Sequence, residues 1–313
     1  MSYIYKPPFF LINGHVETIY PALFRNINFR PYQRERIITD DDDFLDLDWL
    51  TQNSSDLVII SHGLEGNTHR AYVRGMARAL FLSGFDVLAW NYRGCSEEMN
   101  RQLRFYHSGA TDDLDLVIRH ALNKGYRSLR LVGFSLGGNL TLKYLGEKRE
   151  RPAAIRQAIV FSVPLDLYTS CITISQPRNR IYALKFLISL KEKIRRKARF
   201  RKELDVKYLS RIKTLQEFDD RYTAPLHGFK NAREYYESCS SLHFVESIEV
   251  PTRIINARND PFLSEACFPV NKLREHPHVR FFSPDRGGHV GFAQFNSNGV
   301  YWSELQAVEF FSA

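Results

Sequence analysis

Hydrophobic and polar residues follow two different periods along the chain. Between residues 57 and 165, short apolar runs alternate with segments whose apolar residues recur at helical spacing. Strands and helices that alternate in this way form a parallel sheet with helices on both faces. The runs predict strands at 57–63, 85–94, 128–135 and 157–164, and the segments between and after them predict helices near 69–83, 110–123 and 136–147.

The region before residue 57 has a different pattern. Over residues 43–50, aspartates alternate with leucines and a tryptophan, which predicts a half-buried strand, and residues 34–40 are its expected hairpin partner. Residues 1–33 are rich in Pro, Phe and Tyr and contain a short helical pattern at 15–24. We therefore expect an N-terminal arm that lies on the core.

The alternation of strands and helices stops after residue 165 and resumes near residue 250. Residues 166–244 show mainly amphipathic helical patterns, and strands are predicted again at 250–257 and 279–283, with helices near 265–275 and from about 300. A helical insertion between two strands of a parallel sheet is typical of a cap over the carboxyl ends of the strands. The expected organisation is an arm at 1–33, an α/β core at 34–165 and 245–313, and a cap at 166–244.

Composition favours an ordered, globular protein. Of the 313 residues, 44% are hydrophobic and 13% aromatic, enough to build a substantial core. The four cysteines are scattered without a C-x-x-C pair, which argues against a zinc site or a disulfide framework and suits a reducing compartment. No signal peptide and no apolar run of membrane-spanning length is recognisable, so we expect a cytoplasmic location.

The net charge of +8 is concentrated in one stretch, residues 191–202. Such a stretch is typical of a solvated helix face, and the alternative is weak contact with an anionic membrane surface or an acidic ligand. No stacking motif for single-stranded nucleic acid accompanies it, so no nucleic-acid partner is expected. A second charged run, Asp40–Asp43, does not fit a calcium loop, because Phe44 and Leu45 stand where an oxygen ligand and a glycine are needed.

A G-x-S-x-G pattern stands where a predicted strand ends and a predicted helix begins. Ser135 lies between Gly133 and Gly137, and Gly138 follows. A tight turn of this kind exposes the serine hydroxyl above the sheet, and side chains in place of the glycines would clash within it. The context predicts that Ser135 is a nucleophile and that Gly138 lets the helix approach the sheet closely.

A base and an acid follow Ser135 in the chain order that this arrangement uses. His289 stands on a glycine-flanked loop after the last predicted strand, and Asp260 follows the strand before it. Asp166 also follows a strand and is the rival acid, whereas Asp219 and Asp220 lie in the predicted cap and rank below both. We predict that Ser135, His289 and Asp260 act together in nucleophilic catalysis.

Two backbone N–H groups are predicted to form the oxyanion hole. One belongs to Leu136, the residue after the nucleophile, and the other to Leu64, in the loop after the strand at 57–63. Gly63 lets the backbone approach the substrate closely. His62 is expected to fix this loop rather than to act as a second base.

Several segments of the chain carry a family pattern: NGHVETIYPAL, SHGLEGNTHRAYVRGM, NYRGCS, YHSGATDDL, GFSLGGNLTLKYLGE, EFDDRYTAPLHGF, NDPFL and GGHVGF. Together they resemble the YheT-like family of predicted hydrolases and esterases in the α/β-hydrolase superfamily. The resemblance implies the α/β-hydrolase fold, the same three residues Ser135, Asp260 and His289, and hydrolysis of acyl or lipid-like carboxylic esters. No cofactor or metal ion is expected. Glu97 and Met99 depart from the family pattern, which affects the expected shape of their loop.

Three questions stay open at this point. His15 either contacts substrate near the mouth of the site or pins the arm through hydrogen bonds, and the second interpretation is favoured. Cys95 is expected to be a buried small residue rather than a nucleophile. The same three residues would also serve an acyltransferase or a thioesterase, and a non-catalytic lipid-binding or partner-binding protein could share the fold.

Overall fold

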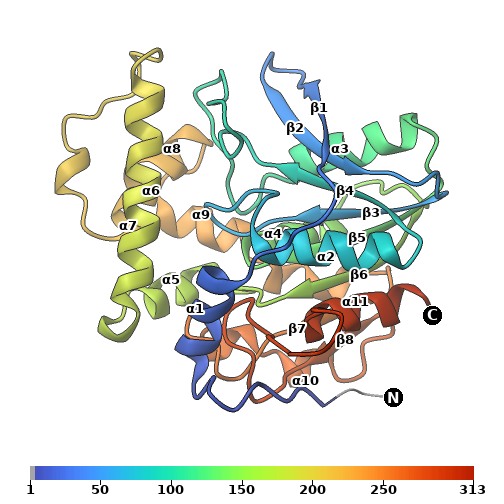
Figure 1. Ribbon diagram of the computed structural model, residues 1–313. Coiled ribbons are helices and arrows are strands. Elements are labelled where there is room, and N and C mark those ends of the chain that lie inside the picture. The colour runs from blue at the N-terminus through green and yellow to red at the C-terminus, as the bar shows by residue number, and fades with distance from the viewer. Residues whose placement is uncertain (1–3) are drawn as a thin grey trace.

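The computed structural model describes residues 4–313, in which one eight-stranded sheet forms the centre (Figure 1). The strands lie in the order β1-β2-β4-β3-β5-β6-β7-β8. The β1–β2 and β2–β4 pairs are antiparallel and all others are parallel, which confirms the predicted hairpin and the mostly parallel sheet. The strands are β1 (Gln33–Ile38), β2 (Phe44–Leu50), β3 (Asp56–Ser61), β4 (Asp86–Asn91), β5 (Ser128–Phe134), β6 (Ile155–Phe161), β7 (Thr252–Ile255) and β8 (Val279–Phe282).

Helices cover both faces of the sheet. Successive residues of a strand point to opposite sides, so one strand contributes to the core on each face. In β3, Ile59 belongs to the core under α3 and α4, whereas Val58 and Ile60 belong to the core under α2 and α11. Both faces of the central strands are therefore buried, which explains their continuous apolar runs. The helices outside residues 166–244 are α1 (Gly14–Phe24), α2 (Ala71–Leu82), α3 (Thr111–Asn123), α4 (Leu136–Gly146), α10 (Val270–Leu273) and α11 (Trp302–Phe311).

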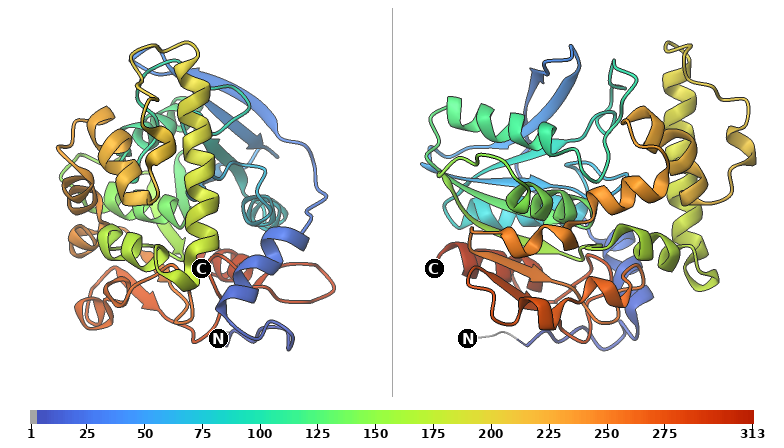
Figure 2. Two further views of the ribbon diagram at one scale, coloured as in Figure 1. Left: turned by 90° about the vertical axis from the view of Figure 1, so that its left-hand side faces the viewer. Right: turned by 180° about the vertical axis from the view of Figure 1, so that it is seen from behind.

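Residues 166–244, between β6 and β7, are helical and lie to one side of the sheet (Figures 1 and 2). Side chains from α5, α6 and α9 line one pocket together with Ser135, so this segment faces the ends of the strands near the predicted nucleophile. Its helices are α5 (Leu167–Ile174), α6 (Arg180–Ala198), α7 (Leu215–Phe218), α8 (Ala224–Leu226) and α9 (Ala232–Cys239).

The prediction of a single helix at 265–275 is wrong. The structure has a 3₁₀ turn at Glu265–Cys267 and the short helix α10 in its place. Pro269 separates them, because proline has no N–H to donate and disfavours helical backbone at the residue before it. Phe268 accordingly leaves the helical region, with φ −123° and ψ 65°.

The prediction that β2 is half-buried is also wrong, because every residue of this strand is buried. The aspartate side that was expected to face water is covered by arginines of β1. Arg36 stands opposite Asp46 and donates to it from Nε at 2.7 Å, and Arg34 donates to Asp48 at 2.8 Å. Cross-strand ion pairs therefore replace solvent on this face.

A buried ion-pair network uses the aspartates that precede β2. The Arg93 guanidinium is 3% exposed and lies 2.8 Å from Asp113, 3.0 Å from Asp43 and 2.9 Å from Asp41. Asp43 is fully buried and also accepts a hydrogen bond from Asn100 at 2.6 Å. The Asp40–Asp43 turn thus serves to neutralise a buried arginine.

Replacing Arg93 by methionine is expected to lower the free energy of unfolding by about 3–5 kcal/mol, because Asp43 and Asp113 would stay buried without their cation. Urea denaturation followed by circular dichroism measures the change. Arg127→Met is the matched control, since Arg127 is exposed and precedes β5. A loss below about 1 kcal/mol for the Arg93 variant would contradict the role given to this network.

Candidate active site

Ser135 lies in a strained turn between β5 and α4. Its backbone has φ 53° and ψ −120°, outside the conformations that non-glycine residues usually adopt. Its N–H donates to the Phe161 carbonyl at 2.9 Å, which fixes the turn to β6. The turn places Ser135 directly before the first residue of α4, at the positive end of the helix.

The glycines around Ser135 are required by close contacts. A Cβ atom on Gly137 would lie 2.4 Å from the Ser61 carbonyl oxygen, and one on Gly133 would lie 2.6 Å from the Gly137 carbonyl oxygen. A Cβ atom on Gly138 would lie 2.5 Å from Val163 and would push α4 away from the strand region behind it. The prediction that Gly138 allows close packing of α4 on the sheet is confirmed.

Ser135, His289 and Asp260 form a continuous hydrogen-bonded chain. His289 Nε2 lies 2.9 Å from Ser135 Oγ, and His289 Nδ1 lies 2.9 Å from Asp260 Oδ2. The Asp260 carboxylate is fully buried and accepts a further hydrogen bond from the Phe262 N–H at 2.9 Å. Because Nδ1–H donates to Asp260, Nε2 carries the lone pair and can accept the serine proton.

The rival acids lie elsewhere. Asp166 caps α5 and accepts a hydrogen bond from the Thr169 N–H at 2.8 Å. Asp220 is exposed and accepts from the Ala232 N–H at 2.7 Å. Asp219 lines the pocket beside Ser135 but bonds to Thr223 and Tyr236 rather than to His289. Of the four carboxylates considered from the sequence, Asp260 is therefore the one in contact with His289.

The loop after β3 approaches Ser135 closely. A Cβ atom on Gly63 would lie 3.2 Å from Ser135 Cβ, and the Gly63 carbonyl closes a tight turn by accepting from the Gly66 N–H at 3.0 Å. Leu64, inside this turn, and Leu136, at the first position of α4, both line the pocket with Ser135. An N–H at the first helical position has no partner within its helix, so the Leu136 N–H is available to a ligand.

Glu65 holds this turn in a left-handed backbone conformation with φ 52°. Its carboxylate pairs with Lys193 of α6 at 2.7 Å and accepts from the Tyr106 hydroxyl at 2.7 Å, and its N–H donates to the same hydroxyl at 2.9 Å. The Ser189 hydroxyl of α6 also donates to this carboxylate. The turn beside Ser135 is thereby fixed to the helical segment above it.

His62 is enclosed by backbone groups. Its Nδ1 lies 2.8 Å from the Gly63 carbonyl and its Nε2 accepts from the Tyr92 N–H at 3.3 Å. Burial lowers the pKa of His62 to about 3, so the ring stays neutral. Both ring nitrogens are used, which agrees with the expectation that His62 fixes the loop.

The N-terminal helix supports the loops that carry Asp260 and His289. Glu17 is fully buried, and its Oε2 accepts from the Asn259 side chain and from the Gly287 N–H, each at 2.7 Å. Thr18 Oγ1 accepts from the His289 N–H at 2.8 Å. Sequence reasoning missed these two residues, although an acidic residue on an otherwise apolar helix was a signal that could have found them.

His15 contacts the helical segment. Its ring stacks on Tyr182 of α6 with 5.8 Å between centroids and 6° between planes, and its Nδ1 lies 3.2 Å from the Tyr182 hydroxyl. Tyr182 in turn packs against Phe262, whose ring lies 4.1 Å from that of His289. These contacts favour the interpretation in which His15 pins the arm.

Two lysines of the basic stretch 191–202 face inward, so the expected solvated helix face is only partly present. Lys193 pairs with Glu65, and its Nζ also lies 3.1 Å from Cys95 Sγ. Lys197 is fully buried, donates to Asn100 at 2.7 Å, and has its pKa lowered to about 7 by burial. Burial raises the pKa of Cys95 to about 11, so this thiol stays protonated at neutral pH. The exposed basic residues of the stretch are Arg195, Arg196, Arg199 and Lys202.

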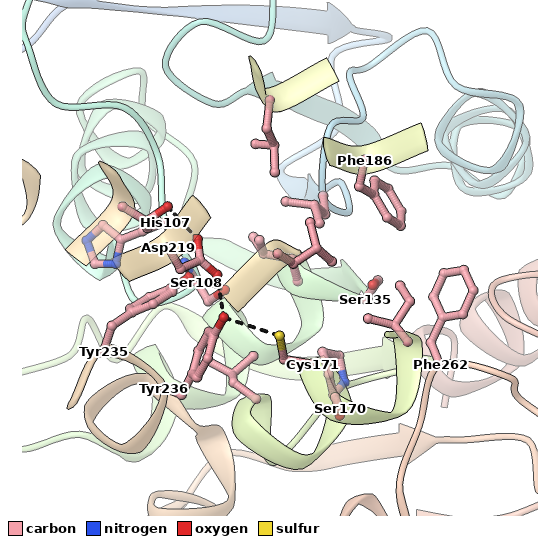
Figure 3. Close-up of a pocket in the computed structure, with 18 of the residues that line it drawn as sticks. His107, Ser108, Ser135, Ser170, Cys171, Phe186, Asp219, Tyr235, Tyr236 and Phe262 are labelled. Atoms are coloured by element: carbon pink, nitrogen blue, oxygen red, sulfur yellow. Dashed lines mark hydrogen bonds between the residues drawn. The ribbon is translucent and has the colours of Figure 1, made fainter. Parts of the chain in front are cut away.

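A pocket extends from Ser135 between the core and residues 166–244 (Figure 3). It contains about 880 Å³ of space between protein atoms, open mouth included. Phe186 and Phe262 lie on the side of the pocket near Ser135, whereas Asp219, Tyr235 and Tyr236 lie on the other side. Its aliphatic and aromatic lining includes Leu167, Ile174, Phe186, Leu190, Leu215 and Phe262.

Comparison with known families shows what this geometry belongs to. Residues 52–267 match the model of the family described as serine aminopeptidase, S33. The chain belongs to the S33 family. This S33-family chain is 34% identical over 290 residues to YheT of Escherichia coli, which is provisionally named an esterase. The match covers 90% of this chain and 84% of that protein. It is 32% identical over 266 residues to a monoacylglycerol lipase of Saccharomyces cerevisiae, covering 80% of this chain and 59% of the lipase.

Solved structures establish the fold of this S33-family member. A crystallised esterase of Pyrococcus furiosus superimposes with a TM-score of 0.60 at 19% identity, covering 92% of this chain and 95% of that one. The predicted α/β-hydrolase fold is confirmed. The names of the two sequence relatives support hydrolase activity on esters. No helix within residues 4–313 is long and apolar enough to cross a bilayer.

Proposed function

We propose that the protein is a serine carboxylesterase that hydrolyses acyl or lipid-like esters. One observation carries the proposal: Ser135, His289 and Asp260 are joined by hydrogen bonds of 2.9 Å on each side of the imidazole, and the serine opens into a mostly apolar pocket. Residues 166–244 act as the cap that shapes this pocket. The four cysteines are free thiols, which fits the proposed cytoplasmic location.

The reaction follows from the position of each group. His289 Nε2 takes the proton of Ser135 as Oγ attacks the ester carbonyl carbon, and the Leu64 and Leu136 N–H groups bind the developing oxyanion. The tetrahedral intermediate collapses to an acyl-enzyme, and His289 returns the proton to the departing alcohol. Water then attacks the acyl-enzyme by the same route, which releases the acid and restores Ser135.

The direct test combines covalent labelling with an ester panel. A fluorophosphonate probe is expected to modify Ser135, as located by peptide mass spectrometry, and p-nitrophenyl esters of graded chain length are expected to be hydrolysed. Added alcohol or thiol acceptors distinguish hydrolysis from acyl transfer by the new ester or thioester formed. A protein that neither labels nor turns over any ester would instead be a non-catalytic binding protein.

We further propose that the exposed side of α6 contacts anionic membrane surfaces that present the substrate. Ile181 and Ile188 are 77% and 65% exposed, and Leu184 lies between them. Arg195 and Arg199 continue the same side at helical spacing and are also exposed. An exposed apolar row that ends in arginines matches a helix lying on an anionic bilayer.

Charge reversal tests this contact. The Arg195→Glu, Arg199→Glu double variant is expected to lose most sedimentation with vesicles that contain phosphatidylserine. Its matched control is the Arg127→Glu, Arg156→Glu double variant. These exposed arginines lie at the amino ends of β5 and β6, away from the carboxyl ends of the strands that the cap faces. Equal binding by both double variants would overturn the proposal.

A further inference from the structure

Asp219 is an acidic side chain in a pocket that is otherwise lined mainly by apolar groups. It lies with Tyr235 and Tyr236 on the side of the pocket away from Ser135 and Phe262 (Figure 3). It begins a single π-helical turn, Asp219–Thr223. Such turns are rare, and they are frequent at functional sites.

The Asp219 carboxylate accepts hydrogen bonds, but within residues 4–313 no positively charged side chain compensates its charge. Its Oδ1 accepts from the Thr223 hydroxyl at 2.5 Å and its Oδ2 accepts from the Tyr236 hydroxyl at 2.6 Å. Within residues 4–313, no lysine, arginine or histidine forms an ion pair with it. A carboxylate has about four acceptor positions, so two protein donors leave capacity for a ligand.

A half-buried carboxylate without a cation is costly to ionise, and the raised pKa of Asp219 reflects that cost. Burial raises the pKa of Asp219 to about 6, despite the two hydroxyl groups that stabilise its charged form. A ligand that donates a hydrogen bond at this point would compensate the charge. A purely alkyl chain would instead leave the carboxylate in an apolar surrounding.

We propose that the pocket binds esters whose pocket-bound chain ends in a hydrogen-bond donor, a hydroxyl or an ammonium group, and that Asp219 accepts this donor. The inference rests on the proposed esterase activity and names its substrate class. Asp219 is then a specificity-determining residue at the far side of the pocket, while Ser135 attacks the carbonyl at the near side.

Paired substrates test the proposal without any variant. For each chain length, a p-nitrophenyl alkanoate is compared with the esters in which the terminal CH₃ is replaced by OH or by NH₃⁺. At the length that reaches Asp219, the wild-type kcat/KM for the donor-ended ester is expected to be at least equal to that of the alkyl ester. An alkyl preference at every length would overturn the proposal while leaving the esterase activity itself established.

Substitution of Asp219 separates recognition from support of the fold. In Asp219→Asn, the ratio of kcat/KM for donor-ended over alkyl esters is expected to fall about tenfold, because a hydrogen bond to a charged acceptor is lost. Fluorophosphonate labelling measures the fraction of active protein in each variant, so that the ratio refers to folded enzyme. Asp220→Asn is the matched control, since its neighbouring carboxylate is exposed. If both ester classes change equally in Asp219→Asn, the residue supports only the pocket wall and the proposal fails.

The pH dependence of the wild-type ratio gives a second measurement that needs no folded variant. Around Asp219, burial raises the pKa of Cys171 to about 11 and raises the pKa values of Tyr235 and Tyr236 well above their usual range. Burial lowers the pKa of His107 well below its usual range. Between pH 5 and pH 8, the preference for ammonium-ended esters is therefore expected to rise with ionisation of Asp219 near pH 6. Any effect of pH on catalysis by His289 cancels in the ratio, because both esters react through the same residue. A ratio that does not change with pH would contradict the proposal.

Discussion

Replacing Ser135 by alanine is expected to lower kcat/KM for ester hydrolysis by a factor on the order of 10⁴ to 10⁶. The variant loses the nucleophile, so no acyl-enzyme forms, and fluorophosphonate labelling is expected to disappear with the activity. Alanine suits the site sterically, because it only removes the oxygen that lies 2.9 Å from His289 Nε2. Steady-state kinetics with p-nitrophenyl esters and gel-based labelling measure both effects.

His289→Ala provides the control for this result. Residues that act as one unit show strongly non-additive losses, so the Ser135, His289 double variant is expected to be about as inactive as either single variant. Losses that multiply would show that the two side chains act in separate steps. Full labelling of Ser135→Ala would place the nucleophile at another residue.

The second large effect is expected at Asp260. Asp260→Asn should lower kcat by about 10³ to 10⁴, because an amide in place of the carboxylate no longer holds His289 in the tautomer with the Nε2 lone pair facing Ser135. The amide also cannot stabilise the imidazolium that forms during attack. The fully buried carboxylate and its 2.9 Å contact with Nδ1 make this position sensitive.

Asp166→Asn is the matched control for Asp260, because Asp166 also follows a strand and was the rival acid by sequence. It caps α5, so its substitution is expected to change stability slightly and kcat less than a few fold. Comparable losses of kcat in both variants, after correction for the folded fraction, would contradict the role given to Asp260. Thermal denaturation of each variant supplies that correction.

The central sheet could be predicted from the sequence because each strand is a short contiguous apolar run. All eight strands were expected near their observed positions, and so was the turn at Ser135. The errors came from ion pairs across a predicted hairpin and from a local breaker. Arg34 and Arg36 bury the polar side of β2, and Pro269 divides the helix expected at 265–275.

The site was predictable in part. Chain order and loop position singled out Ser135, Asp260 and His289, and the fold brings their side chains into contact. Glu17 was missed, and Asp219 was considered only as a lower-ranked acid and not as a pocket residue. Glu17 lies far in sequence from the loops of Asp260 and His289 that it supports, and Asp219 lies far in sequence from Ser135.

The sequence by itself determined the order of strands and helices, the glycine-bounded serine turn and the candidate acid and base, because periodicity and turn chemistry depend on contiguous residues. Only the tertiary structure decided how β2 is buried, how Glu65 and Lys193 join the turn after β3 to α6, and that Asp219 faces the pocket of Ser135. These features arise from side chains that meet across neighbouring strands or across long stretches of chain. Their partners become definite only when the folded backbone sets the distances between them.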